Sequence, residues 1–379
     1  MLSLEKYLQI NNGISTKWQK EPFSLPYSMQ NIQAGYYNVG KNNRVFAFMG
    51  VPKTPMPKGG YPAVVLVHGG LGYAYYEWVK KWTDNGYIAI APDFDSQYAV
   101  GTEYDKRYRE DELERRRVEN IAGGPRGYGS ITETNSDNPW VYFSVLSIKK
   151  ALEVLLQENV INQEKVGLVG ISWGGVLSLI ASSVEKRFKA VEIFYSTGFI
   201  SNSKFGYTQG LKDLTEEQLE IYNNYLDPQT YLSKITQPIA FFAGTNDTAF
   251  VMKNRRRTTD LIKGNKTFSY RLNFPHGHFE VWEYNMEDLA FLDSVFYGKT
   301  LPKAEIEIEN GVCKLTNNNA KKTTLVYTTE EFLSEDTCTW QEIEIENGTL
   351  FPNGVTGYFV TATDKNKTRF SSNIVICKK

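Results

Sequence analysis

An apolar run that ends in a serine between two glycines limits the fold of this chain more than any other stretch. Residues 166–176 spell Val-Gly-Leu-Val-Gly-Ile-Ser-Trp-Gly-Gly-Val, which sets Ser172 between Gly170 and Gly174. The run before the serine predicts a buried strand, and the residues after it predict a helix. Glycines have no side chain where strand and helix backbones must come close, so a sharp turn is expected with the serine at its tip.

A serine in that position is a candidate nucleophile. Its hydroxyl would project into a cleft, and the backbone N–H of Trp173, at the start of the helix, would point toward a developing oxyanion. A chance Gly-x-Ser-x-Gly is the alternative in a chain with 30 glycines. The strand pattern before the serine and the helix pattern after it favour the nucleophile.

The strands predicted before this motif indicate a parallel sheet. Residues 63–67 and 87–91 are unbroken apolar runs joined by a short predicted helix over 77–85, which is a βαβ pattern. The first run ends in His68-Gly69-Gly70, a bend whose backbone N–H groups could face a ligand. Gly70 is therefore the candidate for a second oxyanion donor, and His68 is interpreted as a structural residue that braces the bend.

Two further strands end in residues that could complete a catalytic group. Asp247 follows the apolar run 238–243, and His276 and His278 follow a predicted strand over 268–273. A serine hydroxyl needs a base to remove its proton and an acid to orient that base. The order Ser, Asp, His, each after a strand, is the order found in doubly wound hydrolases.

With these motifs, residues 35–297 resemble the α/β-hydrolase superfamily, and in particular bacterial acetyl xylan esterases and dienelactone hydrolases. The segments that carry the resemblance are residues 67–70, 170–175, 244–247 and 275–278. The resemblance implies a base just before a small or aromatic residue at the end of its loop. That favours His278, before Phe279, over His276. The implied catalytic residues are Ser172, Asp247 and His278, with Gly70 and Trp173 as oxyanion donors.

Several other side chains are candidates for lining a substrate cleft, with packing in the core or cleft wall as the alternative for the aromatic ones. They are Leu71, Tyr73, Arg126, Trp140, His276 and Trp282. No metal and no organic cofactor is implied.

The chain is expected to have a doubly wound, mostly parallel α/β domain and a small all-β domain. We assign residues 1–33 to a lead-in segment and 34–300 to the catalytic domain, with cap-like insertions near 94–138 and 197–237. Within the first insertion, acid–base pairs four residues apart predict a helix that includes Arg115–Arg117. Residues 301–379 are assigned to an immunoglobulin-like or fibronectin-III-like β-sandwich, because the hydrophobic period changes to two.

The same phrase, Glu-Ile-Glu-Ile-Glu-Asn-Gly, occurs at 305–311 and 342–348 of that last region. Each copy predicts a strand that ends in an Asn-Gly turn.

Charge and hydropathy exclude some partners. A formal net charge of −1 over 379 residues argues against nucleic acid. The chain has no run of eighteen apolar residues, so no membrane partner is expected, and the N-terminus shows no signal peptide pattern, which predicts a cytoplasmic protein. A homo-oligomer is left open.

The sequence thus predicts a serine hydrolase that cleaves a carboxylic ester through an acyl-enzyme, with an acetylated carbohydrate as the expected substrate. A prolyl-oligopeptidase-like peptidase is one alternative. A non-catalytic glycan-binding or protein-binding protein on a hydrolase scaffold is the other.

Overall fold

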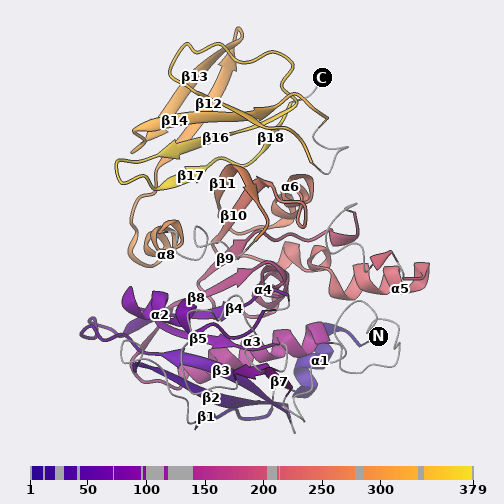
Figure 1. The fold of residues 1–379 in the computed structure, drawn as a ribbon, viewed down its shortest axis with the longest axis vertical. Coiled ribbons are helices and arrows are strands. Elements are labelled where there is room, and N and C mark those ends of the chain that lie inside the picture. Colours follow the sequence, from indigo (N-terminus) through magenta and orange to yellow (C-terminus); the bar gives the residue numbers. More distant parts are fainter. Residues whose placement is uncertain are drawn as a thin grey trace. The chain divides into compact units, whose positions relative to one another are not determined.

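The computed structural model forms two compact units, residues 1–189 with 213–231 and residues 190–212 with 232–379 (Figure 1). It describes residues 2–11, 13–21, 30–40, 43–70, 72–94, 97–99, 115–117, 140–202, 211–212, 214–277, 286–331 and 337–377.

The first unit is built on a mixed sheet with parallel strands at its centre. Its hydrogen-bonded order is β1 (Trp18–Glu21), β2 (Ile32–Val39), β3 (Asn43–Gly50), β5 (Ile88–Pro92), β4 (Tyr61–Val67) and β8 (Ile161–Ile171). β4 runs parallel to both β5 and β8, whereas the β1, β2 and β3 pairings are antiparallel. Every residue of β4 and β5 is buried, as the unbroken apolar runs predict.

Helices connect these strands. α2 (Tyr76–Asp84) joins β4 to β5, α3 (Trp140–Leu156) leads into β8, and α4 (Trp173–Val184) follows it. The unit also contains α1 (Leu4–Asn11) and α5 (Glu216–Ile221), which continues into a π-helical turn at Tyr222–Leu226 and a 3-10 turn at Pro228–Thr230. α5 begins with a capping box, in which Thr215 and Gln218 exchange side chain-to-backbone hydrogen bonds.

The helix predicted across Arg115–Arg117 is wrong. These residues form β7, which pairs antiparallel with β6 (Gln97–Ala99). Charge pairs four residues apart contribute only about 0.2–0.5 kcal/mol each, too little to determine the backbone conformation of a segment.

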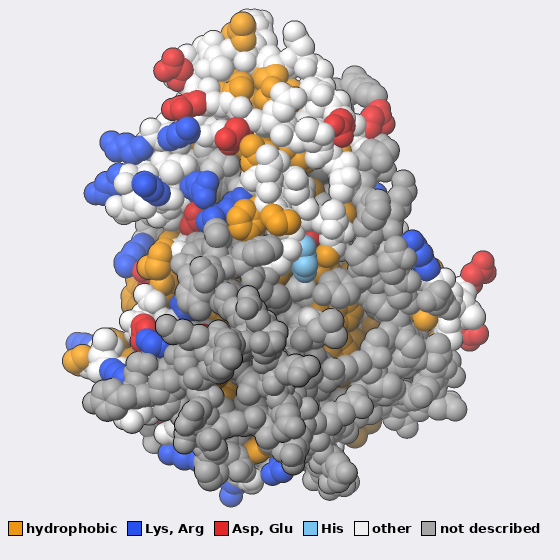
Figure 2. All heavy atoms as spheres, in the orientation of Figure 1, with side chains coloured by type: hydrophobic (Ala, Val, Ile, Leu, Met, Phe, Trp, Pro, Cys, Tyr) orange, Lys and Arg blue, Asp and Glu red, His pale blue; other side chains and the backbone are white. Residues whose placement is uncertain are grey.

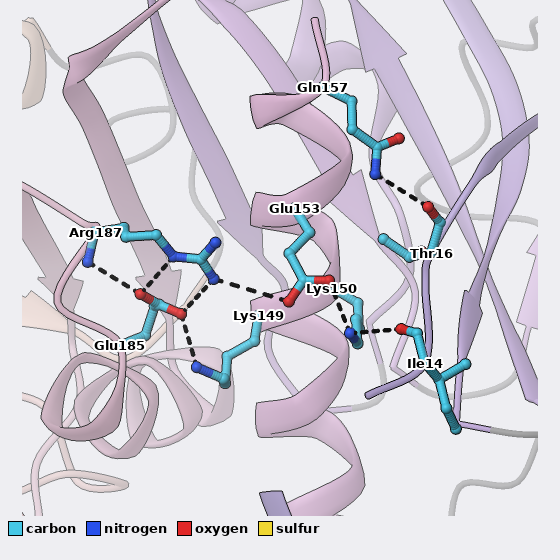
Figure 3. Close-up of polar contacts among 8 residues, drawn as sticks. All are labelled: Ile14, Thr16, Lys149, Lys150, Glu153, Gln157, Glu185 and Arg187. Atoms are coloured by element: carbon cyan, nitrogen blue, oxygen red, sulfur yellow. Dashed lines mark hydrogen bonds and ion pairs between the residues drawn. The ribbon is translucent and has the colours of Figure 1, made fainter. Parts of the chain in front are cut away.

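A buried carboxylate at the C-terminal end of α4 forms an ion pair with a lysine of α3 (Figure 3). Glu185, which follows the helix directly, accepts hydrogen bonds from Lys149 Nζ at 2.7 Å and from Arg187 Nη2 at 2.6 Å. The Arg187 backbone N–H and Nε also donate to it, at 3.0 and 2.9 Å. Burial would raise the pKa of Glu185, but the hydrogen bonds from Arg187 and the charge of Lys149 outweigh burial and lower that pKa to about 2.

The second unit continues the α/β pattern and adds an all-β region. β9 (Ala190–Phe194), β10 (Ile239–Asn246) and β11 (Lys266–Pro275) are parallel, accompanied by α6 (Met252–Leu261) and α8 (Glu287–Tyr297). Short 3-10 turns lie at Ile200–Asn202 and Leu232–Lys234. β11 then pairs antiparallel with β17 (Arg369–Ser371), at Phe268 and Ser371.

From β17 the order continues through β16 (Gly357–Thr363), β14 (Lys322–Thr328) and β15 (Gln341–Glu344), with β18 (Val375–Ile376) also on β16. The hairpin of β12 (Lys303–Glu309) and β13 (Val312–Asn318) supplies a second layer. An apolar core lies between the layers, formed by Ala304, Leu325, Ile345, Tyr358, Val360 and Ala362, with Ile306 and Leu315 packed against it.

The first copy of the repeated phrase makes the predicted hairpin. Asn310 and Gly311 both adopt positive φ, 52° and 76°, as a tight turn matched to the strand twist requires. The second copy differs, because there only Gly348 has positive φ (87°) and Thr349 N–H donates to Glu346 O at 3.1 Å. Identical sequence thus makes two different turns.

The predicted α/β fold class is confirmed: a mixed sheet with parallel central strands and helices, followed by a small all-β region in two layers. The domain boundaries at 33 and 300 stay predictions. In the part of the chain that the structure describes, no helix is long and apolar enough to cross a membrane.

Candidate active site

Ser172 occupies a strained turn between β8 and α4. Its φ and ψ are 52° and −121°, a conformation that a residue with a side chain rarely adopts. Such strain costs of order 1–3 kcal/mol and gathers at functional sites. The residue is 1 % exposed, and its carbonyl accepts the first N–H groups of the helix, from Gly175 at 2.9 Å and Val176 at 3.3 Å. The predicted strand, turn and helix around Ser172 are confirmed.

The two glycines that flank Ser172 are required by close backbone contacts. A Cβ on Gly174 would lie 2.2 Å from the carbonyl oxygen of Val67 at the end of β4. A Cβ on Gly170 would lie 2.3 Å from Ser178 Oγ and 2.5 Å from the carbonyl oxygen of Gly174. The helix can therefore start directly against the two neighbouring strands only because these positions lack side chains.

His68 braces the bend after β4, as predicted. It is 4 % exposed, and its Nε2 accepts a hydrogen bond from the backbone N–H of Phe94 at 2.9 Å. Nδ1 lies 2.8 Å from the carbonyl oxygen of Gly69, which assigns the ring proton to Nδ1. Both ring nitrogens are thus occupied, which leaves His68 no free nitrogen for proton transfer. Gly70, two residues after His68 and three past the end of β4, is half-buried.

Two tryptophans stack on each other at the start of α4. The rings of Trp140 and Trp173 stack with centroids 5.9 Å apart and planes 18° apart. Trp140 Nε1 donates to the carbonyl oxygen of Phe94 at 3.0 Å, which fixes the ring at the end of β5. Trp140, predicted to line the cleft, therefore stacks on the residue that follows Ser172. Tyr73, with the same prediction, is 8 % exposed and packs against Tyr75 with ring centroids 4.2 Å apart.

The second unit holds Asp247 at the carboxyl end of β10. Its carboxylate is buried, and Oδ1 accepts hydrogen bonds from the backbone N–H groups of Ala249 at 3.0 Å and Phe250 at 2.9 Å. These two bonds give the side chain one orientation. His276 Nδ1 lies 3.1 Å from the same oxygen.

His276 thus has the contact that the sequence analysis assigned to His278. Its side chain is 20 % exposed and its ring packs against Tyr195 and Phe250, with centroids 5.0 and 5.6 Å apart. The register of the parallel strands explains the contact. Asn246, the last residue of β10, is paired with Pro275, the last residue of β11. The residues that follow the two strands, Asp247 and His276, are therefore neighbours. His278, the base chosen from the sequence, lies outside the described residues, so that choice stays a prediction.

Arg255 was missed by the sequence analysis. This α6 residue is 0 % exposed, and its Nη2 lies 3.5 Å from Asp247 Oδ2 and donates to the carbonyl oxygen of Phe250 at 3.1 Å. Burial lowers the pKa of Arg255, and the charge of Asp247 offsets part of that effect. Three arginines stand in a row at 255–257. Nothing in that run distinguishes the buried one, because the distinction depends on how α6 packs.

Other predicted site residues, namely Leu71, Arg126 and Trp282, lie outside the described part of the chain. Among the residues that are described, no three His, Cys, Asp or Glu side chains gather in a way that would hold a metal ion.

The fold and the strained serine turn define an α/β-hydrolase. The model of the dienelactone hydrolase family matches residues 46–278, and the chain belongs to that family. A comparison with curated proteins finds no significant match.

Similar solved structures include two acetyl xylan esterases. That of a Paenibacillus species has a TM-score of 0.60 at 17 % identity, over 77 % of this chain and 93 % of the other. That of a Thermoanaerobacterium species has a TM-score of 0.58 at 17 % identity, over 76 % and 92 %. A puromycin hydrolase matches with a TM-score of 0.50 at 16 % identity, over 75 % of this chain and 40 % of that one. At these identities the likeness shows the shared fold.

Proposed function

We propose that this protein is a serine esterase that removes an acyl group, of the acetyl type, from a carbohydrate. The observation that carries the proposal is the backbone of Ser172, held at φ 52° between strand and helix. In an α/β-hydrolase this turn presents a nucleophilic hydroxyl. The buried Asp247 and its contact with His276 supply the acid and base that such a hydroxyl needs.

The proposed reaction has two halves. The Oγ of Ser172 attacks the ester carbonyl carbon while Nε2 of His276 takes the hydroxyl proton, and Asp247 stabilises the imidazolium through Nδ1. The tetrahedral oxyanion accepts hydrogen bonds from the backbone N–H of Trp173 and, as predicted from the sequence, of Gly70. Collapse releases the alcohol, protonated by His276, and leaves an acyl-serine. Water, deprotonated by His276, then attacks the acyl carbon and releases the acid.

The carbohydrate part of the proposal has separate support. The two esterases reported above are named for acetyl groups on xylan. Trp140 stacks on Trp173, the residue that follows Ser172 in the chain, and flat aromatic rings are suitable surfaces for sugar rings.

Covalent labelling and a substrate panel test the proposal. A fluorophosphonate probe should label the wild type and not Ser172→Ala. p-Nitrophenyl acetate and acetylated xylose should be hydrolysed, whereas aminoacyl p-nitroanilides should not be. Preferential cleavage of the nitroanilides would indicate a peptidase, and a failure to label would indicate a non-catalytic protein.

The two neighbouring histidines form a matched pair of variants. His276→Ala should lose about 10⁴-fold or more in kcat, close to the loss in Ser172→Ala, because nucleophile and base act as one unit. His278→Ala should lose about tenfold or less through altered loop packing. The reverse pattern would return the role of base to His278.

A further inference from the structure

The C-terminal sheet presents a polar face opposite its apolar core. The register pairs Lys322 with Thr363 and Thr363 with Arg369, so these three side chains lie on one face of β14, β16 and β17. Their neighbours along the strands point the other way, since Leu325 and Ala362 belong to the core against the β12–β13 hairpin. The polar face is therefore built by strict alternation within the second unit.

This face and the end of β11 line an open cavity of about 590 Å³. That volume is within the usual range of ligand pockets, about 300–1,000 Å³. The β11 side of its lining includes Arg271, Asn273 and Phe274, the residues that lead into Pro275 and His276.

Positive charge dominates the lining. Four cations line the cavity, Arg271, Lys322, Lys367 and Arg369, against one carboxylate, Glu342. Figure 2 shows Lys and Arg side chains gathered on this side of the C-terminal region, over the ends of β16 and β17.

Two carboxylates next to the cavity neutralise part of this charge. Glu287 accepts a hydrogen bond from Arg271 Nη2 at 2.7 Å, and Glu344 lies 3.1 Å from Lys322 Nζ. Burial, and then the like charge of Arg271, lower the pKa of Arg369. With Glu287, Glu342 and Glu344 counted, the described groups leave one positive charge in excess, which suits an anionic ligand.

The uncharged lining suits a sugar. Thr324, Thr361 and Thr363 contribute hydroxyl groups, Asn273 contributes an amide, and Phe274 contributes an aromatic ring. Hydroxyl and amide groups can both donate and accept hydrogen bonds, as sugar hydroxyls require.

We propose that this cavity binds an acidic saccharide, with the carboxylate of a uronic acid paired to Arg369 and Lys322. The inference goes beyond ester hydrolysis and does not depend on it, because binding can be measured on Ser172→Ala as well as on the wild type.

Calorimetric titration of the full chain with digalacturonate tests this inference, with neutral galactobiose and inorganic phosphate as comparison ligands. Digalacturonate should bind saturably and galactobiose at least about tenfold more weakly, because it lacks the charge-assisted contacts. Lys322→Ala and Arg369→Gln should each raise the Kd for digalacturonate about tenfold.

Lys321→Ala is the matched control, since this exposed lysine is adjacent in sequence and does not line the cavity. It should leave the Kd unchanged. All three variants should hydrolyse p-nitrophenyl acetate at the wild-type rate, since none alters a residue assigned to the reaction.

Three results would overturn the inference: no saturable binding of digalacturonate, equal binding of galactobiose, or a Kd unaffected by both cavity variants. If phosphate bound as tightly as digalacturonate, the cavity would be a general site for oxyanions, and the proposal that it binds an acidic saccharide would be refuted.

Discussion

Replacing Glu185 by Gln should destabilise this protein by about 3 kcal/mol at neutral pH. The carboxylate lies at the end of α4, the helix that begins at Ser172, and only 5 % of its side chain is exposed. Lys149 and Arg187 both bind it. Its loss would leave a buried cation at Lys149 without its carboxylate partner.

The magnitude follows from proton linkage. The pKa of Glu185 falls from 4.5 to about 2 on folding, and each pH unit of pKa change is worth about 1.4 kcal/mol, which gives about 3 kcal/mol. Because the folded-state pKa is the lower one, this stabilisation is fully present above about pH 4.5. It is lost as the pH falls through the folded-state pKa, near 2.

Urea denaturation of both proteins at several pH values between 7 and 2 measures the effect. The difference in free energy of unfolding between wild type and Glu185→Gln should be largest at pH 7 and shrink steadily below about pH 4.5. Other carboxyl groups titrate equally in both proteins, so the difference isolates Glu185.

Glu164→Gln is a suitable control. Glu164 also pairs with a lysine, Lys189 at 2.9 Å, but its side chain is 79 % exposed, so we expect a loss of about 1 kcal/mol or less at every pH. A Glu185→Gln variant as stable as Glu164→Gln at pH 7, or with a deficit that does not change with pH, would refute the reasoning.

Three further substitutions test other parts of the fold and site. Gly174→Ala would place a Cβ 2.2 Å from Val67 O and should reduce p-nitrophenyl acetate hydrolysis about 100-fold or more while circular dichroism stays unchanged, since misplacement by about 1 Å is enough for such a loss. Arg255→Met should cost about 3–5 kcal/mol in urea denaturation, because it leaves Asp247 buried without its guanidinium partner. Gly311→Ala should cost about 1–2 kcal/mol by the same measurement, because it forces a side chain to adopt a φ of 76°.

Local patterns predicted much of the fold and the strained turn at Ser172. The apolar run at 63–67 lies within β4, the Gly-x-Ser-x-Gly motif makes the strained turn, and Asn310-Gly311 makes its hairpin. In each case, neighbouring residues determine the structure through steric limits or through burial on both faces of a strand. A short stretch of sequence contains all of that information.

The contacts that the sequence did not predict depend on pairing between distant segments. The contact of His276 with Asp247 follows from the register that pairs Asn246 with Pro275, and no local pattern specifies that register. Arg255 is buried because of how α6 packs. Its neighbours Arg256 and Arg257 are also arginines, so the sequence alone does not show which of the three is buried. The pairing of β17 with β11 joins residues about a hundred positions apart. Each of these two strands can be predicted from its own residues, but the pairing between them cannot.

The pairing of β17 with β11 also covers an edge of β11 that would otherwise have no strand partner. β11 hydrogen-bonds β10 on one side, and on the other Tyr270 N–H donates to Ser371 Oγ while Ser269 Oγ donates to the carbonyl oxygen of Arg369. Without residues 303–377, this side of β11 would become an open strand edge, a template for another chain. A chain without that region would thus be expected to fail first by self-association, through the exposed edge of the strand that leads into His276.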